Sequence, residues 1–283
     1  MKIRQALIWG IKNFKNSKSS VLDAEVLILR SLKQKNKRTK EQITKSFLYT
    51  NPEFKLSQTI QKKFKKLIKK RAVGIPVAYL THHKEFFGLD FYVDKNVLIP
   101  RPETELLVEE ALKYVKKKKK ILDIGTGSGC IIIAMAVNSK PLIDNKYYAT
   151  DISQKALKIA RKNAKINKVK IHFIKSNLFK NIPKNLKFDI IIANLPYLDP
   201  RWIDAELLNE SRASLDGGKN GLAIINNFLS QAKNYLKKNG KIILEIDPRQ
   251  KESTKKSAKN YFSSKNVTLK KDLSGSPRVI IIS

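Results

Sequence analysis

The sequence predicts an α/β fold in which a small all-helical region precedes a mostly parallel β-sheet with helices on both faces. Two observations support this. From Lys120 onward, short β-rich apolar stretches alternate with stretches of helical periodicity, which is typical of a parallel sheet. Before residue 73, apolar residues recur at helical spacings and no strand pattern is present.

Residues 1–72 are predicted to form a helical domain. In "KLSQTIQKKFKKLIKKRA" the apolar residues fall on one helical face and lysines cover the other. That face consists of Leu56, Ile60, Phe64, Leu67 and Ile68. An amphipathic helix of this kind is expected to pack against the helices predicted in "ALIWGIKNF" and "SVLDAEVLILRSL".

Residues 73–98 contain Gly, Pro, aromatic and β-branched residues, and "EFFGLDFYVD" is typical of a β-hairpin. We interpret this stretch as a linker with a β-hairpin, leading into a second domain over residues 99–283. The next helix is predicted in "RPETELLVEEALKYV", where Pro102 suits a first turn and Thr104 suits a helix cap.

The second domain is predicted to contain five strands that alternate with helices, followed by a hairpin. The strands are "KILDIG", "YYATDI", "KIHFIK", "FDIIIAN" and "KIILEID". The helices are expected at about 129–138, 153–166, 222–238 and 249–261. At the end of the chain, "VTLKKDL" and "RVIIIS" flank the short turn "SGSP" and predict a C-terminal β-hairpin.

The composition narrows the class of protein but does not choose a substrate. One Cys and three His in 283 residues argue against a disulfide and a Cys/His zinc site, so no metal is expected. We see no signal peptide and no membrane-length apolar run, so we expect a cytoplasmic protein without a membrane partner. The net charge of +34 predicts either non-specific nucleic-acid affinity or compositional drift.

The stretch "LDIGTGSGCIIIAMA" predicts a ligand-binding turn between a strand and a helix. The turn consists of Gly125, Thr126, Gly127, Ser128 and Gly129. Glycines let a ligand approach main-chain N–H groups at a helix N-terminus. The spacing matches neither a dinucleotide fingerprint nor a P-loop. The preceding Asp123 would repel a phosphate and favours a cationic or amino-bearing ligand.

Two further strand ends are candidates for the same site. Asp151, in "ATDIS", suits a ribose diol, because a carboxylate accepts two hydroxyl donors; the alternative is that it caps the next helix. Asn177 and Leu178, in "KSNLFKNIP", are placed to contact a heterocycle, one by hydrogen bonding and one by packing. For these two, the alternative is an ordinary loop with Phe179 in the core.

The motif "NLPY" ends the fourth strand and predicts a clamp for a planar amino group. The side-chain oxygen of Asn194 and the carbonyl of Leu195 are suited to accept its two N–H groups. Pro196 keeps Leu195 extended, and Tyr197 is expected to lie against the planar group. Together with the glycine turn, this predicts a class I S-adenosyl-L-methionine-dependent methyltransferase that acts on an amide or an adenine. Asn194 is then also expected near the cofactor.

The stretch "GIPVAYLTHHKEFFGLDFYVDKNVLIPRPETELLVEEAL" closely resembles the signature region of the HemK/PrmC-type family of protein-(glutamine-N5) methyltransferases. "LDIGTGSGCIIIAMA", "ATDIS", "FDIIIANLPYLD", "SLDGGKNGLAIINNFL" and "GKIILEID" follow in that family's order. The resemblance implies a Rossmann-like seven-stranded domain and a helical domain that docks a peptide chain release factor. The implied substrate is the glutamine of the factor's Gly-Gly-Gln loop, with Asn194 to Tyr197 holding its amide. We expect a monomer.

Three departures from the family pattern concern the site. Leu195 replaces a proline, Asn177 replaces an acid, and Glu210-Ser211 replaces a Glu-Pro pair. The first keeps the carbonyl acceptor but predicts a less rigid loop.

Two rival functions stay open on the residues. Asn-Leu-Pro-Tyr also resembles the motif of rRNA adenine dimethyltransferases, although the order of domains and "IPRPETE" argue against that family. The other is a degenerate methyltransferase that serves as an RNA- or ribosome-binding module. The intact glycine turn, Asp151 and Asn194 argue against it.

Overall fold

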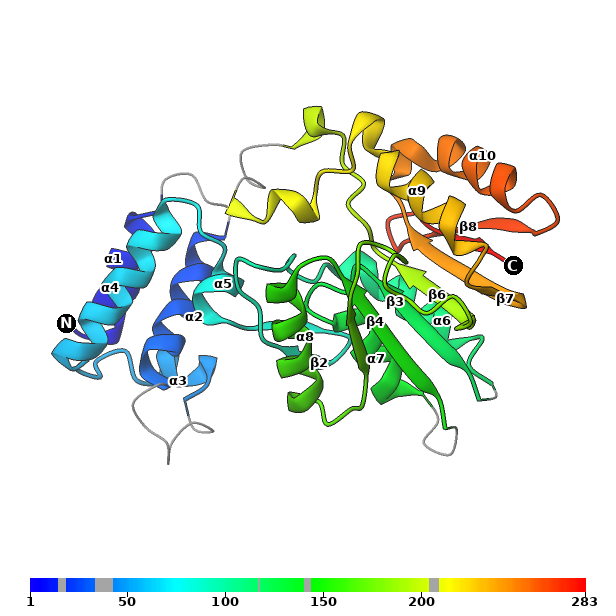
Figure 1. Cartoon of the computed structure of the whole chain (residues 1–283). Helices are drawn as coiled ribbons and strands as arrows, with labels where there is room; N and C mark the ends of the chain where they lie inside the picture. The colour runs from blue at the N-terminus through cyan, green and yellow to red at the C-terminus, as the bar shows by residue number, and fades with distance from the viewer. Residues whose placement is uncertain (15–18, 34–42, 117, 140–143, 204–208) are drawn as a thin grey trace. The chain divides into compact units, whose positions relative to one another are not determined.

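The computed structural model describes residues 1–14, 19–33, 43–116, 118–139, 144–203 and 209–283 (Figure 1). The chain divides into two compact units, Met1–His82 and His83–Ser283. Every site residue predicted from the sequence belongs to the second unit. Within the described ranges, no helix is both long and apolar enough to cross a membrane.

The first unit is built from helices around its own core. They are α1 (Ile3–Lys12), α2 (Ser20–Lys33), α3 (Lys45–Thr50), α4 (Gln58–Ala72) and α5 (Val77–Thr81). On α4, Phe64 and Ile68 are fully buried, and Ile60 and Leu67 pack against the same core. The apolar face predicted for this helix is therefore confirmed.

The second unit contains a seven-stranded, mostly parallel sheet. Its strands are β3 (Lys120–Ile124), β4 (Lys146–Asp151), β5 (His172–Lys175), β6 (Phe188–Ala193), β7 (Leu236–Glu245), β8 (Val267–Lys271) and β9 (Pro277–Ile282). The spatial order is β5-β4-β3-β6-β7-β9-β8. β9 pairs antiparallel with both β7 and β8, and the other neighbours are parallel. This confirms the predicted α/β fold with a C-terminal hairpin.

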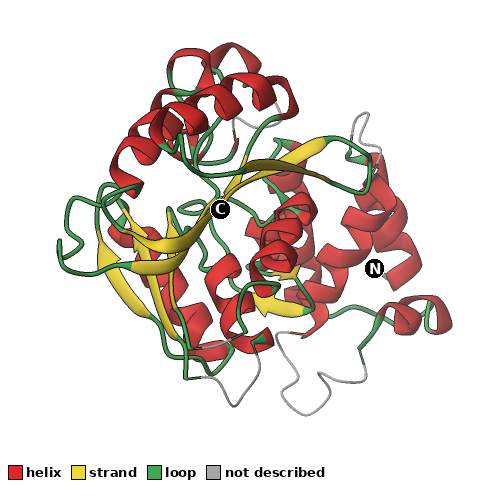
Figure 2. Ribbon diagram, turned by 90° about the vertical axis from the view of Figure 1, so that its right-hand side faces the viewer, coloured by secondary structure: helices red, strands yellow, loops and turns green. Residues whose placement is uncertain are grey.

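Helices cover both faces of the sheet (Figure 2) because side chains alternate along each strand. On β3, Ile121 joins the core that contains residues of α6 (Glu105–Leu112) and α7 (Cys130–Asn138). Leu122 and Ile124 join the opposite core, with α9 (Ala223–Ala232) and α10 (Lys251–Tyr261). The central strands are buried on both faces and are mostly apolar, as in "KFDIIIAN".

Two details refine the predicted elements. β1 (Lys84–Phe86) and β2 (Leu89–Phe91) form the predicted hairpin, and the positive φ of Phe87 and Gly88 suits its two-residue turn. The helix expected over 222–238 is α9 and ends at Ala232, so its predicted end is wrong. Leu236 already pairs with Phe188, and the chain must leave the helix to start β7.

The parallel arrangement brings the carboxyl ends of β3, β4, β5, β6 and β7 to one edge of the sheet. In sheets of this kind, ligands bind beyond the carboxyl ends of the strands. α8 (Gln154–Ile166) begins at the same edge, after β4. The glycine turn, Asp151 and "NLPY" therefore reach a common place although they lie far apart in the sequence.

Candidate active site

A cavity of about 540 Å³ lies at this edge, a size suited to a small-molecule ligand. Ten of the predicted site residues line it: Gly125, Thr126, Gly127, Ser128, Asp151, Asn177, Leu178, Asn194, Leu195 and Pro196. Gly129 and Tyr197 do not belong to the lining.

The glycine turn needs a backbone that other residues adopt poorly. Gly125, Gly127 and Gly129 have φ of 74°, 54° and 83°. A Cβ on Gly129 would lie 2.9 Å from Cδ1 of Ile133 and 3.2 Å from Cβ of Ala160, so this glycine permits close packing. A Cβ on Gly127 would meet nothing within 4 Å. The space beside Gly127 is therefore open, and the predicted approach of a ligand to this turn stays a prediction.

Asp151 ties the glycine turn to the start of α8. Its Oδ2 accepts the N–H of Gly127 at 2.9 Å, and its Oδ1 accepts the N–H of Ser153 at 2.8 Å. Ser153 itself caps α8, because its side chain accepts the N–H of Ala156. Burial raises the pKa of Asp151, and the two backbone N–H groups oppose this. Each carboxylate oxygen keeps a lone pair for a hydroxyl donor from the cavity.

Asp123 lies beneath the turn and does not line the cavity. Its Oδ2 accepts the hydroxyl of Thr126 at 2.6 Å, and Oδ1 has no hydrogen-bond partner among the described residues. Burial raises the pKa of Asp123 to about 7, and the charge of Asp151 adds to the effect. Asp123 therefore carries little charge below pH 7, and Asp151, which lines the cavity, is the acid that favours a cationic ligand over a phosphate.

Asn177 and Leu178 form the wall after β5. Leu178 has a φ of 48°, although it is not glycine, and its side chain is nearly fully buried beside Phe179. A bulky residue in this backbone region is strained, and such strain is concentrated at functional sites. Asn177 is exposed, and its carbonyl closes the turn by accepting the N–H of Lys180 at 3.1 Å.

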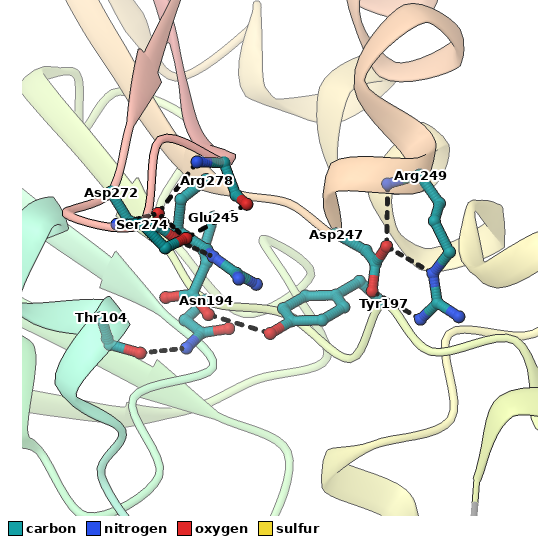
Figure 3. Close-up of polar contacts among 10 residues, drawn as sticks. Thr104, Asn194, Tyr197, Glu245, Asp247, Arg249, Asp272, Ser274 and Arg278 are labelled. Atoms are coloured by element: carbon teal, nitrogen blue, oxygen red, sulfur yellow. Dashed lines mark hydrogen bonds and ion pairs between the residues drawn. The ribbon is translucent and has the colours of Figure 1, made fainter.

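Asn194 is oriented by a residue from a distant segment (Figure 3). Its Nδ2 donates to Oγ1 of Thr104 at 3.1 Å. Thr104 ends the short 3-10 helix η1 (Pro102–Thr104) and makes no capping hydrogen bond, so its predicted role as a helix cap is wrong. With Nδ2 engaged, Oδ1 lies on the other side of the amide, and no described residue donates to it. Asn194 thus offers the predicted acceptor.

Leu195 is held by burial. Its side chain is 4% exposed, and a Cβ on Gly125 would lie 3.1 Å from its Cδ2. No described residue donates a hydrogen bond to its carbonyl, which is the second predicted acceptor. Packing against the glycine turn thus restrains the position where the family has a proline.

The rest of the "NLPY" loop is hydrogen-bonded to the segment around "DGGKNG" and to Gln250. The N–H of Leu198 donates to the carbonyl of Leu215 at 3.0 Å, and the N–H of Gly217 donates to that of Leu198 at 2.8 Å. A Cβ on Gly217 would lie 2.8 Å from the carbonyl oxygen of Pro196, so only glycine permits this approach. Gln250 Nε2 donates to the carbonyl of Tyr197 at 2.8 Å. These contacts supply rigidity that Leu195 does not.

Tyr197 points into the protein. Its hydroxyl donates to Oε1 of Glu245 at 3.0 Å (Figure 3). Glu245 ends β7, is 1% exposed, and its Oε2 has no hydrogen-bond partner among the described residues. Burial raises the pKa of Tyr197, and the nearby charge of Glu245 raises it further. The expected contact of Tyr197 with a planar substrate group stays a prediction.

The segment "IPRPETE" also fixes the loop around Glu210. Arg101 forms an ion pair with the buried Glu210, whose Oε2 accepts the N–H of Ile99 at 3.4 Å. Ser211 and Ser214, in the same loop, line the cavity. The Glu210-Ser211 departure therefore retains an anchored loop.

Sequence reasoning missed five residues that build the site: Thr104, Gly217, Gly221, Glu245 and Gln250. Gly221 belongs to this set because a Cβ there would overlap the carbonyl oxygen of Tyr197. Four of them lie in segments quoted for the family resemblance, and Gln250 follows "GKIILEID" by three residues, but nothing local indicates their partners. Each acts across long sequence separations, as Thr104 does with Asn194. Only the sheet topology brings them together.

Comparison with known proteins agrees with this geometry. A methyltransferase domain model matches residues 115–275, and a PrmC N-terminal domain model matches residues 5–81. A release factor glutamine methyltransferase of Koribacter versatilis is 33% identical over 99% of this chain and 98% of its own. One of Coxiella burnetii is 37% identical over 94% of this chain and 92% of its own.

Among solved structures, a 16S rRNA methyltransferase of T. thermophilus in complex with AdoMet and guanosine shares the fold. It superposes with a TM-score of 0.53 at 17% identity, over 71% of this chain and 49% of that chain. This likeness concerns the methyltransferase fold alone. The full-length relatives decide the family, and this chain belongs to the release factor glutamine methyltransferases.

Proposed function

We propose that this protein transfers a methyl group from S-adenosyl-L-methionine to the N5 amide nitrogen of the glutamine in the Gly-Gly-Gln loop of peptide chain release factors, and so supports translation termination. The observation that carries this is the orientation of Asn194, whose Nδ2 is held by Thr104 while Oδ1 is left as an acceptor beside the glycine turn. The naming of its full-length relatives supports the substrate.

The cofactor would be held along the β3, β4 and β5 side of the cavity. The residues proposed for this are Gly125, Thr126, Gly127, Ser128, Gly129, Asp151, Asn177, Leu178 and Asn194. Bound there, S-adenosylmethionine supplies an electrophilic methyl group on a sulfonium. The open main chain at Gly127 admits the ligand, Asp151 accepts hydroxyl donors, and Leu178 offers an apolar wall.

Asn194 and Leu195 do the positioning on the substrate side. A glutamine amide is a poor nucleophile because its nitrogen lone pair is delocalised. Oδ1 of Asn194 and the carbonyl of Leu195 accept its two N–H groups, which aims the nitrogen and favours its pyramidal form. The proton is lost after methylation, so the residues need no strong base. Catalysis then rests on orientation and on exclusion of water.

We further propose the division of labour between domains. Residues 1–72 dock the release factor, and residues 99–283 bind the cofactor and the glutamine. Residues 73–98 link these two domains. On α4, a shallow surface is lined by Lys62, Lys65, Lys66, Lys69 and Lys70. It suits acidic partner groups and gives non-specific affinity for nucleic acid. The protein acts as a monomer in the cytoplasm, where release factors work.

The decisive experiment offers three methyl acceptors side by side with labelled S-adenosylmethionine. They are a release factor, the same factor with its loop glutamine replaced by alanine, and naked rRNA. We expect label on the unaltered factor alone. Label on rRNA alone would establish the adenine alternative. Absence of both label and calorimetric cofactor binding would favour the non-enzymatic RNA-binding module.

A further inference from the structure

Behind Asn194 lies a set of polar side chains of which the function proposed above uses only Thr104. Thr104 is 2% exposed and Glu245 is 1% exposed. They come from η1 and from the end of β7, and Tyr197 joins them from the loop after β6 (Figure 3). Buried polar groups of this kind are costly unless they are hydrogen-bonded, so their arrangement calls for a reason.

The hydrogen bonds of this set have a fixed direction. Thr104 Oγ1 accepts from Asn194 Nδ2, so its own hydrogen stays available for a second partner. The carboxylate of Glu245 acts on this hydroxyl, and its buried Oε2 has no hydrogen-bond partner among the described residues. Tyr197 donates to Oε1 of Glu245. An ionised carboxylate can only accept. Ionised Glu245 would therefore draw the hydroxyl hydrogen of Thr104 toward itself, which leaves Thr104 Oγ1 to accept from the amide nitrogen of Asn194, as it does at 3.1 Å.

We propose that Glu245 is a positioning residue for methyl transfer: through Thr104 it keeps Oδ1 of Asn194 toward the cavity, and through Tyr197 it holds the loop that carries Asn194. The proposal rests on the proposed function. It assigns to the carboxylate the task of distinguishing the two ends of a nearly symmetrical carboxamide. Without a fixed hydrogen-bond direction, the amide could turn and present its N–H₂ to the substrate, which repels the substrate's own N–H groups.

The charge state of Glu245 connects this arrangement to pH. Burial raises the pKa of Glu245, and the charge of Glu103 raises it further. The hydroxyls of Thr104 and Tyr197 and the charge of Arg278 oppose this rise. Cys130 also lies within electrostatic range. Protonation frees the Thr104 hydroxyl from donating to Glu245, so Asn194 loses its fixed orientation. Activity should fall as pH drops through the raised pKa of Glu245.

The first test is Glu245→Gln, which keeps the shape and introduces a donor. We expect kcat for release-factor methylation to fall on the order of 10- to 100-fold, as for a misoriented catalytic group, with little change in cofactor Kd or in KM. The acid limb of the wild-type kcat profile should disappear. Glu110→Gln is the matched control. Glu110 lies on α6 and is also a buried glutamate, but it forms an ion pair with Lys113, the residue that follows this helix.

The second test separates the hydroxyl from the shape of Thr104. Thr104→Val should lower kcat on the same order as Glu245→Gln, and Thr104→Ser, which restores the hydroxyl, should recover most of it. Thr254→Val is the control, because Thr254 is fully buried in α10 and its hydroxyl has no partner among the described residues. It should leave kcat unchanged.

The outcomes distinguish the two proposals. A wild-type enzyme that does not methylate the release factor would contradict the proposed function. If the wild type is active, equal kcat in Glu245→Gln and wild type, or equal kcat in Thr104→Val and Thr104→Ser, would overturn the positioning role. An acid limb that persists in Glu245→Gln would do so too. If Glu245→Gln fails to fold, the Thr104 pair decides.

Discussion

The two sides of the cavity are built by different means. Along β3 and β4, the wall is main chain, shaped by three glycines of positive φ within five residues and tied by Asp151 at the end of the next strand. Along β6, the wall includes the side chain of Asn194, whose amide donates to Thr104 from a distant segment, and the loop that carries it is tied to Glu245 through Tyr197. The side proposed to hold the cofactor is therefore specified mainly by residues close in sequence, whereas the side proposed to hold the substrate depends on tertiary hydrogen bonds.

The largest effect should come from the substrate side. Asn194→Ala removes one of two acceptors for the amide, and we expect kcat to fall by a factor on the order of 1,000, about 4 kcal/mol, as for loss of one preorganised polar group. Cofactor affinity should be nearly unchanged, which calorimetry can check alongside the methylation assay. A large loss of cofactor binding would contradict the substrate-side role of Asn194 and assign it to cofactor binding.

On the cofactor side, the glycines should differ among themselves. Gly129→Ala brings a Cβ to 2.9 Å from Ile133 and also has a positive φ, so we expect about 3 kcal/mol lower free energy of unfolding. Gly127→Ala has only the unfavourable φ, and about 1 kcal/mol is expected. Chemical denaturation measures both. Equal losses would show that packing under the turn does not distinguish them.

Beneath the turn, Asp123 should make stability depend on pH. Burial raises its pKa to about 7 from 3.8, so the folded state holds a proton that the unfolded state has released. The free energy of unfolding should therefore fall as pH rises from 5 to 7, by about 2 kcal/mol. Asp123→Asn should flatten this slope in thermal unfolding series. An unchanged slope would mean that Asp123 is ionised throughout.

A modest effect is expected at Asp151, the residue proposed to accept hydroxyl groups of the cofactor. Asp151→Ala removes an acceptor for a diol and two ties to the main chain, and cofactor affinity should weaken about tenfold, roughly 1.4 kcal/mol. kcat at saturating cofactor should change less. Calorimetry and saturation kinetics separate the two quantities. If Asp151→Ala lowered kcat and left cofactor affinity unchanged, the assignment of Asp151 to the cofactor would be contradicted.

The fold and the cofactor side were accessible from the sequence because their signals are local. Strand–helix alternation predicts the parallel sheet, and three glycines in five residues predict the turn. The end of α9 was predicted too late, because pairing of Leu236 with Phe188 overrides helical periodicity. Thr104 was predicted to be a helix cap, because a hydroxyl near a helix start suits that role locally.

The sequence by itself determined the order of strands and helices, the glycine turn, and Asn194 as a carboxamide at a strand end. Only the tertiary structure decided which end of that carboxamide faces the cavity. Its direction depends on Thr104, 90 positions away, and the tyrosine of the same motif turns inward to Glu245, 48 positions away. Hydrogen-bond direction is set by partners in space, and the parallel sheet assembles those partners from separate segments.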